Sequence, residues 1–462
     1  MANRIVQFLA MVSGSFLPLT CGINLGWPSP FLPKLQEPDS QIPMNSDEAS
    51  WVAVMPLIGG PFGAFLGALL VDKLGRKNLL LTQGPLIALS FLIMAFFNNI
   101  WVLCVIRFIV GSAEGAIYTA LPIYYGEIAD PKIRGILGSS LAVSALMGNL
   151  LINVIGSYLS LFWSSIISGG FALIHFFTFV WMPESPYFLI KKGLLEEAKA
   201  SLTKLRGEFD TKEFDEIKNA VKRQEACEKS KFLDLVTVKS NRKAMGIFII
   251  LTLTNKVTGM TPVMFYTVKI FTEADGILDP VSSVFSFNMV GLIGTILALF
   301  IIDRFGRRPL MLFSAFGCCF ALLGEAIFFM IKIYLEEYLE YVQWLPLVSL
   351  MAFNLIFCLG LAFGPVLFLS ELFPTSVKAN ALGAAETISV TLGTAISKIF
   401  HYLTDAYGMV VPFWSFAVCT ALAGYLIFLV VPETKGKTLE EIQLDLIGQR
   451  DDEHREKQGQ KV

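Results

Sequence analysis

Long apolar stretches separated by short polar ones follow one another through nearly the whole chain. Each stretch has about 20 residues, the length of an α-helix that crosses the hydrocarbon core of a bilayer. The short alternating stretches typical of membrane β-barrel strands are not seen. We therefore predict an all-α membrane protein with twelve transmembrane helices, near residues 6–28, 52–71, 78–97, 101–124, 135–158, 162–182, 244–272, 281–302, 309–332, 343–370, 379–403 and 411–431.

One long polar segment interrupts this pattern after the sixth stretch. Residues 183–243 are rich in Lys and Glu. Within them, 194–206 is predicted to be an amphipathic helix that ends at Gly207, and a second helix is expected after Asp210. The expected organisation is an N-terminal six-helix half at 1–182, a cytoplasmic helical linker at 183–243, a C-terminal six-helix half at 244–431 and a cytoplasmic tail at 432–462.

The composition agrees with a membrane protein. Hydrophobic residues make up 54% of the chain and charged residues only 16%, whereas a soluble domain is about one quarter charged. The mean hydropathy is +0.63. A formal net charge of -2 gives no indication of nucleic acid as a partner.

Lysine and arginine predict the orientation, because cytoplasmic loops of membrane proteins carry an excess of them. With both termini in the cytoplasm, all but six of the 36 Lys and Arg fall on the cytoplasmic side. The exceptions are Lys34, Arg107, Lys256, Lys269, Lys332 and Lys398. This distribution predicts a multi-pass protein of the cell membrane with both termini cytoplasmic.

The sequence has no pattern typical of an enzyme or a metalloprotein. Six of the seven cysteines lie in apolar stretches and Cys227 lies in the central polar segment, so no disulfide framework is expected. The three histidines are far apart, and no Ser/His/Asp constellation is recognisable. The trio GKT at 436–438 lacks the first glycine of a phosphate-binding loop, because position 431 is valine. We expect no catalytic residue, no metal site and no cofactor.

Three short motifs occur once in each half. The loop after the second predicted helix is DKLGRK at 72–77, and the loop after the eighth is DRFGRR at 303–308. A Glu and a basic residue seven positions later flank the loops after the fourth and tenth helices, and a Pro-Glu pair closes each half. A duplication of six helices in parallel orientation is the layout of major facilitator transporters.

The duplicated loops are predicted to form a gate at the cytoplasmic side. Their glycines give a tight turn the backbone freedom it needs. Their acidic and basic residues are placed to form ion pairs that keep the gate closed, and these pairs are expected to break when the halves move and the gate opens. Simple anchoring by positive charge is the alternative, but anchoring requires neither an acid nor a fixed spacing. The predicted gate residues are Asp72, Gly75, Arg76, Glu127, Arg134, Glu184, Asp303, Gly306, Arg307, Glu371, Lys378 and Glu433.

Further motifs complete a specific order along the chain. GINLG lies at 22–26, an R-x3-G-x3-G-x6-P-x-Y-x2-E pattern runs from Arg107 to Glu127, PESP lies at 183–186, and PETKGKTLEEI lies at 432–442. Together they cover nearly the whole chain, which resembles the sugar porter family of the major facilitator superfamily and is most similar to its insect group of facilitated trehalose transporters, or trehalose transporter-like proteins. The resemblance implies alternating access about a central sugar site between the halves. Gly111 and Gly115 form a small-xxx-small face, whose main role is expected to be close helix packing.

The positions that bind sugar in this family are mostly changed here. Family members use amides and a tryptophan, and a polar group left unpaired in a dry site costs roughly 1–3 kcal/mol. Carried over one by one, the implied central-cavity positions are Asn255, Lys256, Thr261, Ser389, Ala142, Gly291, Pro365 and Val366. The tryptophan is lost, while Pro365 is kept. Tyr187 and Lys378 also stand where the family usually has arginine.

Charged residues inside the apolar stretches mark a candidate functional site, because a charge at the bilayer centre costs about 2.5–3.5 kcal/mol on insertion scales. Lys256 replaces a neutral amide of the family and is implied to face the central cavity. Glu114 is its candidate partner, and Arg107 lies two helical turns from Glu114 on the same helix face. Lys256 is expected to form a structural pair with Glu114 or with carbonyls freed by Pro262, to bind an anionic or carbonyl-bearing substrate, or to relay protons.

The expected function is facilitated transport of a small sugar, trehalose or hexose by the resemblance. Asn24 stands where proton-coupled sugar porters typically place an aspartate, which favours a uniporter. Because the sugar-contacting amides are mostly lost, two alternatives stay open, a facilitator of a non-sugar or anionic solute contacted by Lys256 and a non-transporting nutrient sensor. The expected partners are a small solute and the lipid bilayer.

Overall fold

Helices make up the regular structure of this protein. The structure is a computed structural model that describes residues 4–130, 133–227, 234–365, 368, 372–373, 375–433, 435 and 441–442. Val366 and Glu371 lie outside the described residues, as do the side chains of Asp303 and Lys378. Every regular element within the described ranges is an α-helix, apart from the 3-10 turn η1 (Glu336–Tyr338). The predicted all-α fold is confirmed.

Twelve transmembrane helices were predicted, and the described residues contain ten or eleven candidate spans. In the described part of the chain, ten helices are long and apolar enough to cross a membrane, and a bent pair, Glu336–Val342 with Leu345–Leu359, gives an eleventh. The stretch predicted at 379–403 forms the 33-residue helix α20 (Thr375–Tyr407). This helix is not among the candidate spans found in the described residues.

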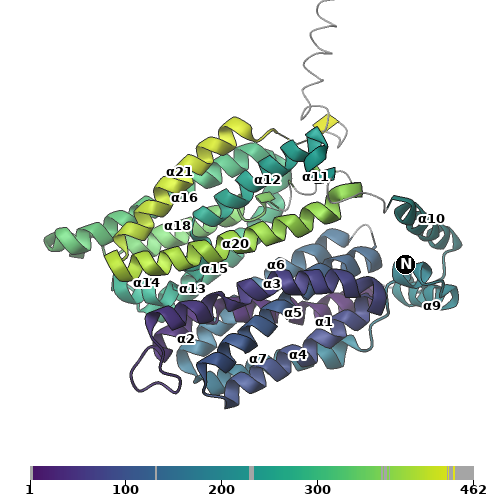
Figure 1. Ribbon diagram of the computed structural model, residues 1–462, viewed down its shortest axis with the longest axis horizontal. Coiled ribbons are helices and arrows are strands. Elements are labelled where there is room, and N and C mark those ends of the chain that lie inside the picture. The colour runs from purple at the N-terminus through teal and green to yellow at the C-terminus, as the bar shows by residue number, and fades with distance from the viewer. Residues whose placement is uncertain are drawn as a thin grey trace, which may run out of the picture. The chain divides into compact units, whose positions relative to one another are not determined.

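The first of two compact units contains Met1–Ala226 and Pro262–Leu292 (Figure 1). Its helices are α1 (Ile5–Gly26), α2 (Pro28–Leu35), α3 (Ser46–Leu74), α4 (Arg76–Phe96), α5 (Ile100–Ile128), α6 (Arg134–Tyr158), α7 (Leu161–Phe179), α8 (Pro186–Lys191), α9 (Leu195–Arg206), α10 (Thr211–Cys227), most of α13 (Met260–Phe265), α14 (Thr267–Ala274) and the first half of α15 (Pro280–Phe305).

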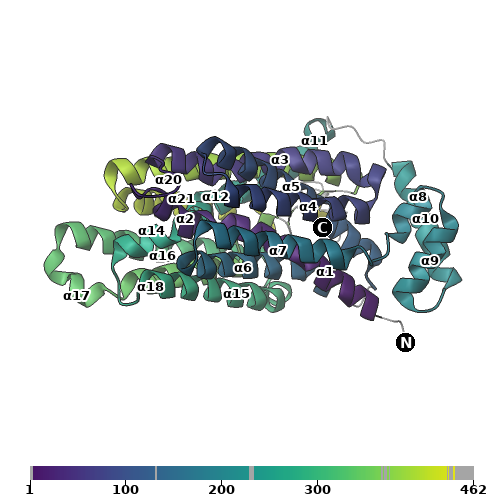
Figure 2. The same cartoon turned by 90° about the horizontal axis from the view of Figure 1, so that it is seen from below.

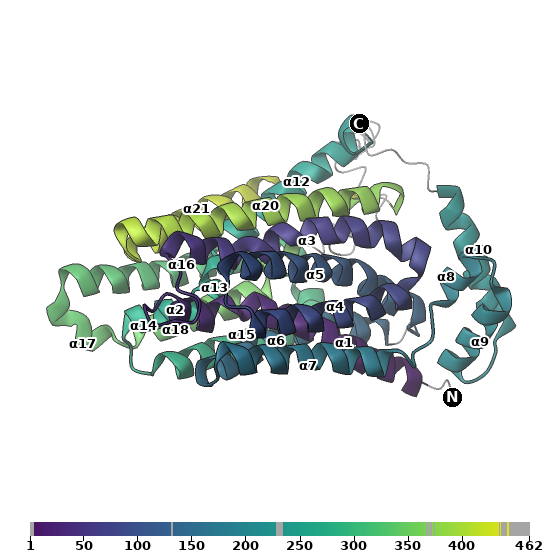
Figure 3. The same ribbon diagram turned by 60° about the horizontal axis from the view of Figure 1, so that its bottom comes forward.

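Small residues let α3 and α5 approach each other closely within this unit (Figure 3). A Cβ atom on Gly63 would lie 1.7 Å from the Ser112 carbonyl oxygen, and one on Gly115 would lie 1.9 Å from the Gly60 carbonyl oxygen. A Cβ on Gly111 would likewise meet backbone atoms of α3. Backbone contact this close is typical of small residues at helix interfaces in membranes, so the predicted packing role of Gly111 and Gly115 is confirmed.

The polar segment after α7 folds into a small helical cluster that belongs to the first unit (Figure 2). α8, α9 and α10 share a buried apolar core of Phe188, Leu189, Ile190, Ala198, Leu202, Phe214, Ile217 and Val221. As predicted, α9 ends at Gly207, whose φ is 89°. Arg206 donates to the Ile128 carbonyl at 2.9 Å, and Gln7 donates to the Leu205 carbonyl at 3.0 Å, which ties α9 to α5 and α1.

The second compact unit contains Cys227–Thr261 and Ile293–Val462. Its helices are α11 (Asp234–Thr237), α12 (Lys239–Val257), the second half of α15, α16 (Arg307–Tyr334), α17 (Leu339–Val342), α18 (Leu345–Leu359), α20 and α21 (Val410–Val430), with η1 between α16 and α17. α16 packs against α18 and α21, and α12 packs against α20 and α21.

Two helices predicted as continuous are broken, and those predictions are corrected. The stretch at 244–272 forms α12, α13 and α14, with Gly259 at a φ of 77° between α12 and α13. A Cβ on Gly259 would lie 2.3 Å from the Phe416 ring, so both the turn and the packing require glycine. The stretch at 343–370 also stops early, because α18 ends at Leu359 and a turn follows.

The close approach of α3 and α5 predicts a specific sensitivity to added volume. Gly115→Ala forces the new methyl group into the backbone of α3 and is expected to lower the free energy of unfolding by about 1–3 kcal/mol. Gly126→Ala in the same helix is the matched control, because a Cβ there meets nothing within 4 Å. Thermal unfolding of the purified chain in detergent measures both. Equal melting temperatures for the two variants would contradict the packing argument.

Candidate functional site

Arg76 is the centre of an ion-pair cluster in the first unit. The residue is 7% exposed and begins α4. Its Nε and Nη2 atoms donate to the two carboxylate oxygens of Glu127 at 2.9 and 3.0 Å, which is a bidentate pair. Its Nη1 donates to the Asp72 carboxylate at 2.9 Å. One guanidinium therefore ties together the ends of α3, α4 and α5.

The two acids of this cluster have further partners from the two ends of α8, Ser185 before its first residue and Lys191 as its last. The Lys191 ammonium donates to Asp72 at 3.0 Å, and the Ser185 hydroxyl donates to Glu127. Arg134 lies exposed at the start of α6. The structure thus brings Asp72, Arg76 and Glu127 together inside one unit, and their action as a gate stays a prediction.

Glu184 caps the N-terminus of α4. Its two carboxylate oxygens accept from the Lys77 backbone N–H at 3.0 and 3.1 Å, where the helix dipole favours negative charge. Gly75 has a φ of 96°, and a Cβ there would lie 2.4 Å from a Glu184 oxygen. Burial raises the pKa of the Glu184 carboxyl, against the effect of the backbone N–H groups of Ser185 and Lys77.

The second unit repeats this cap. The Glu433 carboxylate accepts from the backbone N–H groups of Arg307 and Arg308, each at 3.1 Å. Gly306 precedes α16 with a φ of 87°, close to that of its counterpart Gly75. The sequence duplication therefore corresponds to a duplicated helix cap, in which a glutamate from the end of each half holds the start of that half's third long helix.

Arg107 is a fully buried cation in the first unit. Its guanidinium lies 4.5 Å from the centre of the Trp27 ring, which is a cation–π contact. Its Nε donates to the Val52 carbonyl at 2.8 Å, and its Nη2 donates to the Asn24 carbonyl at 3.4 Å. An aromatic face and two carbonyl oxygens thus stabilise the charge inside the bundle.

Glu114 has a partner that the sequence analysis missed. The Asn24 side-chain amide donates to the Glu114 carboxylate at 2.8 Å. Asn24 therefore contacts both charged residues, Arg107 through its carbonyl and Glu114 through its amide. The sequence did contain a signal for this contact, because Asn24 is a polar residue within the apolar first stretch and therefore needs a polar partner there. The hypothesis that Lys256 pairs with Glu114 stays a prediction.

Asn255 connects the two helix breaks of the second unit. Its amide donates to the Leu361 carbonyl, in the turn that follows α18, at 2.8 Å. The Leu361 N–H donates to the Ser314 hydroxyl at 3.1 Å, and that hydroxyl donates to the Ile356 carbonyl at 2.7 Å. Side chains of α12 and α16 thus satisfy the irregular backbone, as is required inside a membrane.

The other predicted cavity positions lie at several places in the two units. Lys256 lies in the last turn of α12, where the partial negative charge of a helix C-terminus stabilises a cation. In the second unit, Lys256, Thr261, Ser389 and Pro365 are all partly exposed. In the first unit, Ala142 is partly exposed on α6 and Gly291 is buried on α15.

Glu325 is a second buried acid, on α16 of the second unit. The residue is 0% exposed, and neither carboxylate oxygen has a hydrogen-bond partner among the described residues. A carboxylate in such surroundings is costly, so the side chain is best accommodated as the neutral acid.

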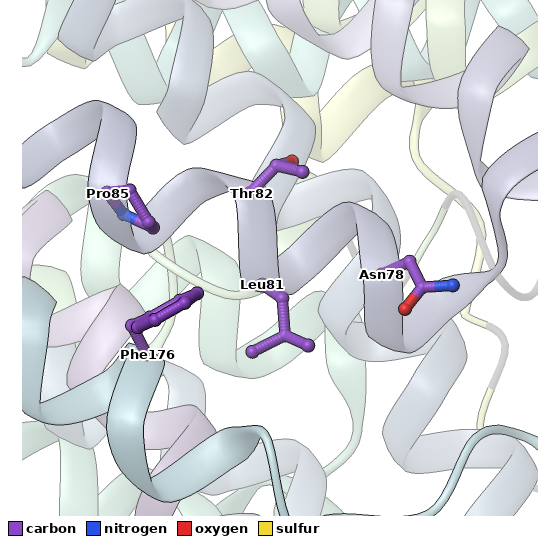
Figure 4. A pocket seen from close by; sticks show the side chains of 5 residues that line it. All are labelled: Asn78, Leu81, Thr82, Pro85 and Phe176. Atoms are coloured by element: carbon purple, nitrogen blue, oxygen red, sulfur yellow. The ribbon is translucent and has the colours of Figure 1, made fainter.

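One surface hollow lies between α4 and α7, with a volume of about 410 Å³ (Figure 4). It is lined by Asn78, Leu81, Thr82, Pro85 and Phe176. The Asn78 amide already donates to the Leu74 carbonyl at the end of α3, and the Thr82 hydroxyl donates to the Leu79 carbonyl of its own helix. None of the sequence-predicted site residues lines it.

Comparison with known proteins covers nearly the whole chain. A family model described as "Sugar (and other) transporter" matches residues 20–446. The chain is 32% identical over 456 residues to trehalose transporter 1 of Drosophila melanogaster, covering 96% of this chain and 52% of that protein. It is 31% identical over 450 residues to the facilitated trehalose transporter Tret1 of Polypedilum vanderplanki, covering 96% and 88%. The chain thus spans only about half the length of several relatives it matches.

Solved structures show a similar fold. The inward open conformation of the xylose transporter XylE from E. coli matches with a TM-score of 0.78 at 20% identity, covering 95% of this chain and 99% of that one. The proton:xylose symporter XylE bound to 6-bromo-6-deoxy-D-glucose matches with a TM-score of 0.74 at 22% identity, covering 96% and 99%. These similarities confirm the major facilitator fold.

The Arg76 cluster predicts a large difference between two arginines. Arg76→Ala leaves the acids of the cluster without their shared cation, and loss of one partner of a buried pair costs about 3–5 kcal/mol. Arg134→Ala, at an exposed position, is the matched control and is expected to change the free energy of unfolding by about 0.5 kcal/mol or less. Thermal unfolding in detergent compares them. A melting temperature of Arg76→Ala equal to that of Arg134→Ala would refute the assigned role.

Proposed function

We propose that this chain, which belongs to the sugar transporter family of the major facilitator superfamily, is a facilitative uniporter that carries trehalose or a hexose by alternating access. The main support from the structure is the break between α12 and α13 at Gly259. Broken helices are typical of transporter binding sites, because their freed backbone groups and flanking polar side chains contact the substrate. Here the break is flanked by Asn255, Lys256 and Thr261. Relatives at 31% and 32% identity are named as trehalose transporters.

Uniport is the finer part of this proposal and rests on the first unit. Asn24 carries a neutral amide, and this amide donates to Glu114. A neutral residue at this position of the first helix cannot take up and release a proton. We also propose that the protein lies in the cell membrane with both termini cytoplasmic, on the basis of the distribution of Lys and Arg.

The duplicated loop motifs are proposed to act at the cytoplasmic gate. Arg76 binds Asp72 and Glu127, which keeps the ends of α3, α4 and α5 together. Alternating access by rocking of two bodies requires such rigidity. Each half also has its glutamate cap, and the caps at Glu184 and Glu433 give the two halves the same local construction.

Lys256 supports a second candidate, transport of an anionic solute. The lysine is partly exposed at the end of α12, and a cation inside a membrane protein is commonly a substrate contact. A third candidate, a nutrient sensor without flux, keeps the same fold. Substrate charge separates the first two candidates, and saturable flux separates both from the third.

Labelled uptake in oocytes tests these candidates with the full chain and measured surface delivery. We expect saturable uptake of trehalose or a hexose that persists when the proton gradient is collapsed. Lys256→Gln is expected to keep uptake of the neutral sugar within about tenfold, because one lost hydrogen bond is worth roughly 0.5–1.5 kcal/mol. Lys269→Gln in α14 is the matched control.

Each other outcome selects a different candidate. Uptake of organic anions alone, abolished by Lys256→Gln and kept by Lys269→Gln, would replace the sugar proposal with the anion candidate. Normal surface delivery without uptake of any tested sugar, polyol or anion would favour the sensor. Sugar uptake that stops with the proton gradient would contradict uniport.

A further inference from the structure

Three asparagines form a chain of amides inside the first unit. The Asn149 amide on α6 donates to the side-chain carbonyl of Asn288 on α15 at 2.7 Å. The Asn153 amide donates to the backbone carbonyl of Asn149 at 2.8 Å and to its side-chain oxygen at 3.1 Å. Asn288 in turn donates to the Val284 carbonyl at 2.9 Å. All three asparagines are at most 5% exposed.

This amide chain links parts of the protein that are far apart in sequence. α6 belongs to the first predicted half, whereas α15 belongs to the second, yet residues up to Leu292 cluster with the first unit. The hydrogen bond between Asn149 and Asn288 joins these two segments. A second hydrogen bond of this kind lies near it, from the Val268 N–H of α14 to the Ser29 hydroxyl of α2 at 3.3 Å.

Close packing holds Asn149 in position. A Cβ on Gly26 at the end of α1 would lie 2.0 Å from the Asn149 side-chain oxygen. A Cβ on Gly148 would lie 1.9 Å from the Leu19 carbonyl oxygen. α1 and α6 therefore pack closely around Asn149, and a side chain at either glycine would force the packing to shift.

Position along the helices places the amide chain away from the gate loops. Asn149 lies roughly 22 Å along α6 from its start at Arg134, at 1.5 Å per residue. Asn288 lies about two turns from the start of α15. With cytoplasmic termini, as proposed above, this is the outer half of the membrane.

We propose that the hydrogen bond between Asn149 and Asn288 is a latch that holds the outer end of the transport path closed and breaks when that end opens. The inference rests on the proposed alternating access. A buried amide pair adds little stability over apolar residues of the same shape, but a hydrogen bond between membrane helices is weak enough to break and form reversibly. The Asn153 side-chain oxygen has no partner among the described residues, although the residue is 3% exposed. The Asn153 side-chain oxygen is therefore an acceptor that can receive a new hydrogen bond when the outer end is open.

Thiol labelling tests the latch without any transport substrate. Ser29→Cys places a thiol at the same end of the first unit, and a membrane-impermeant maleimide is added to intact cells that express the full chain. We expect Asn288→Ala in this background to raise the labelling rate at position 29 by roughly 3- to 20-fold, the range that corresponds to one interhelical hydrogen bond in a membrane. Site-resolved mass spectrometry separates this thiol from the native cysteines.

Ser168→Ala is the matched control. Ser168 is 0% exposed on α7, and its hydroxyl donates only within its own helix, to the Ser164 carbonyl at 2.7 Å. Labelling that rises with Asn288→Ala and not with Ser168→Ala supports the latch. An unchanged rate with Asn288→Ala, or an equal rise with both, would overturn it.

A double-variant cycle provides the second measurement. Asn149→Ala and Asn288→Ala break the same bond, so the double variant is expected to label no faster than either single variant. Independent, multiplying effects would show that the two residues do not act as one latch. Because neither measurement requires uptake, failure of the latch and failure of the transport proposal are distinguishable.

Discussion

A polypeptide inside a hydrocarbon layer has no water to satisfy its backbone, and this constraint determines where the polar side chains of this protein lie. Lys34 donates to three carbonyls at the end of α6, at 2.6, 3.1 and 3.4 Å. Asn255 satisfies the carbonyl of Leu361 in the turn after α18. Even the buried guanidinium of Arg107 donates to backbone carbonyls. These three side chains thus satisfy backbone carbonyls that would otherwise lie unpaired or compete for donors.

The apolar pattern predicted much of this fold because hydrophobic length is a local property of the chain. The all-α fold, the helix that ends at Gly207 and the packing role of Gly111 and Gly115 were all visible in the sequence. The breaks were less visible, since the need for glycine at position 259 depends partly on the ring of Phe416, which leaves no space for a side chain there. Residues some 150 positions apart determine that contact, and no local pattern reports it.

The site was harder to predict than the fold for a related reason. Spacing identified Glu184 and Glu433 as acids at equivalent positions of the repeat. It did not show that each accepts hydrogen bonds from the backbone at the start of a distant helix. Resemblance supplied positions such as Ala142 and Gly291, where this chain offers no polar side chain. The hydrogen-bonding capacity of its interior lies elsewhere, in asparagines such as Asn24, whose partners depend on tertiary packing.

The cap at Glu184 has a consequence for how the protein is made. Glu184 lies 107 positions after the Lys77 backbone N–H that it binds, and at 5–20 residues per second a ribosome needs roughly 5–20 s to cover that distance. Until then the turn at Gly75 lacks the acid that caps α4. Each half therefore completes its second loop only when its sixth helix has been synthesised, so a ribosome that stalls before that point leaves an inserted but unfinished bundle for quality control to recognise.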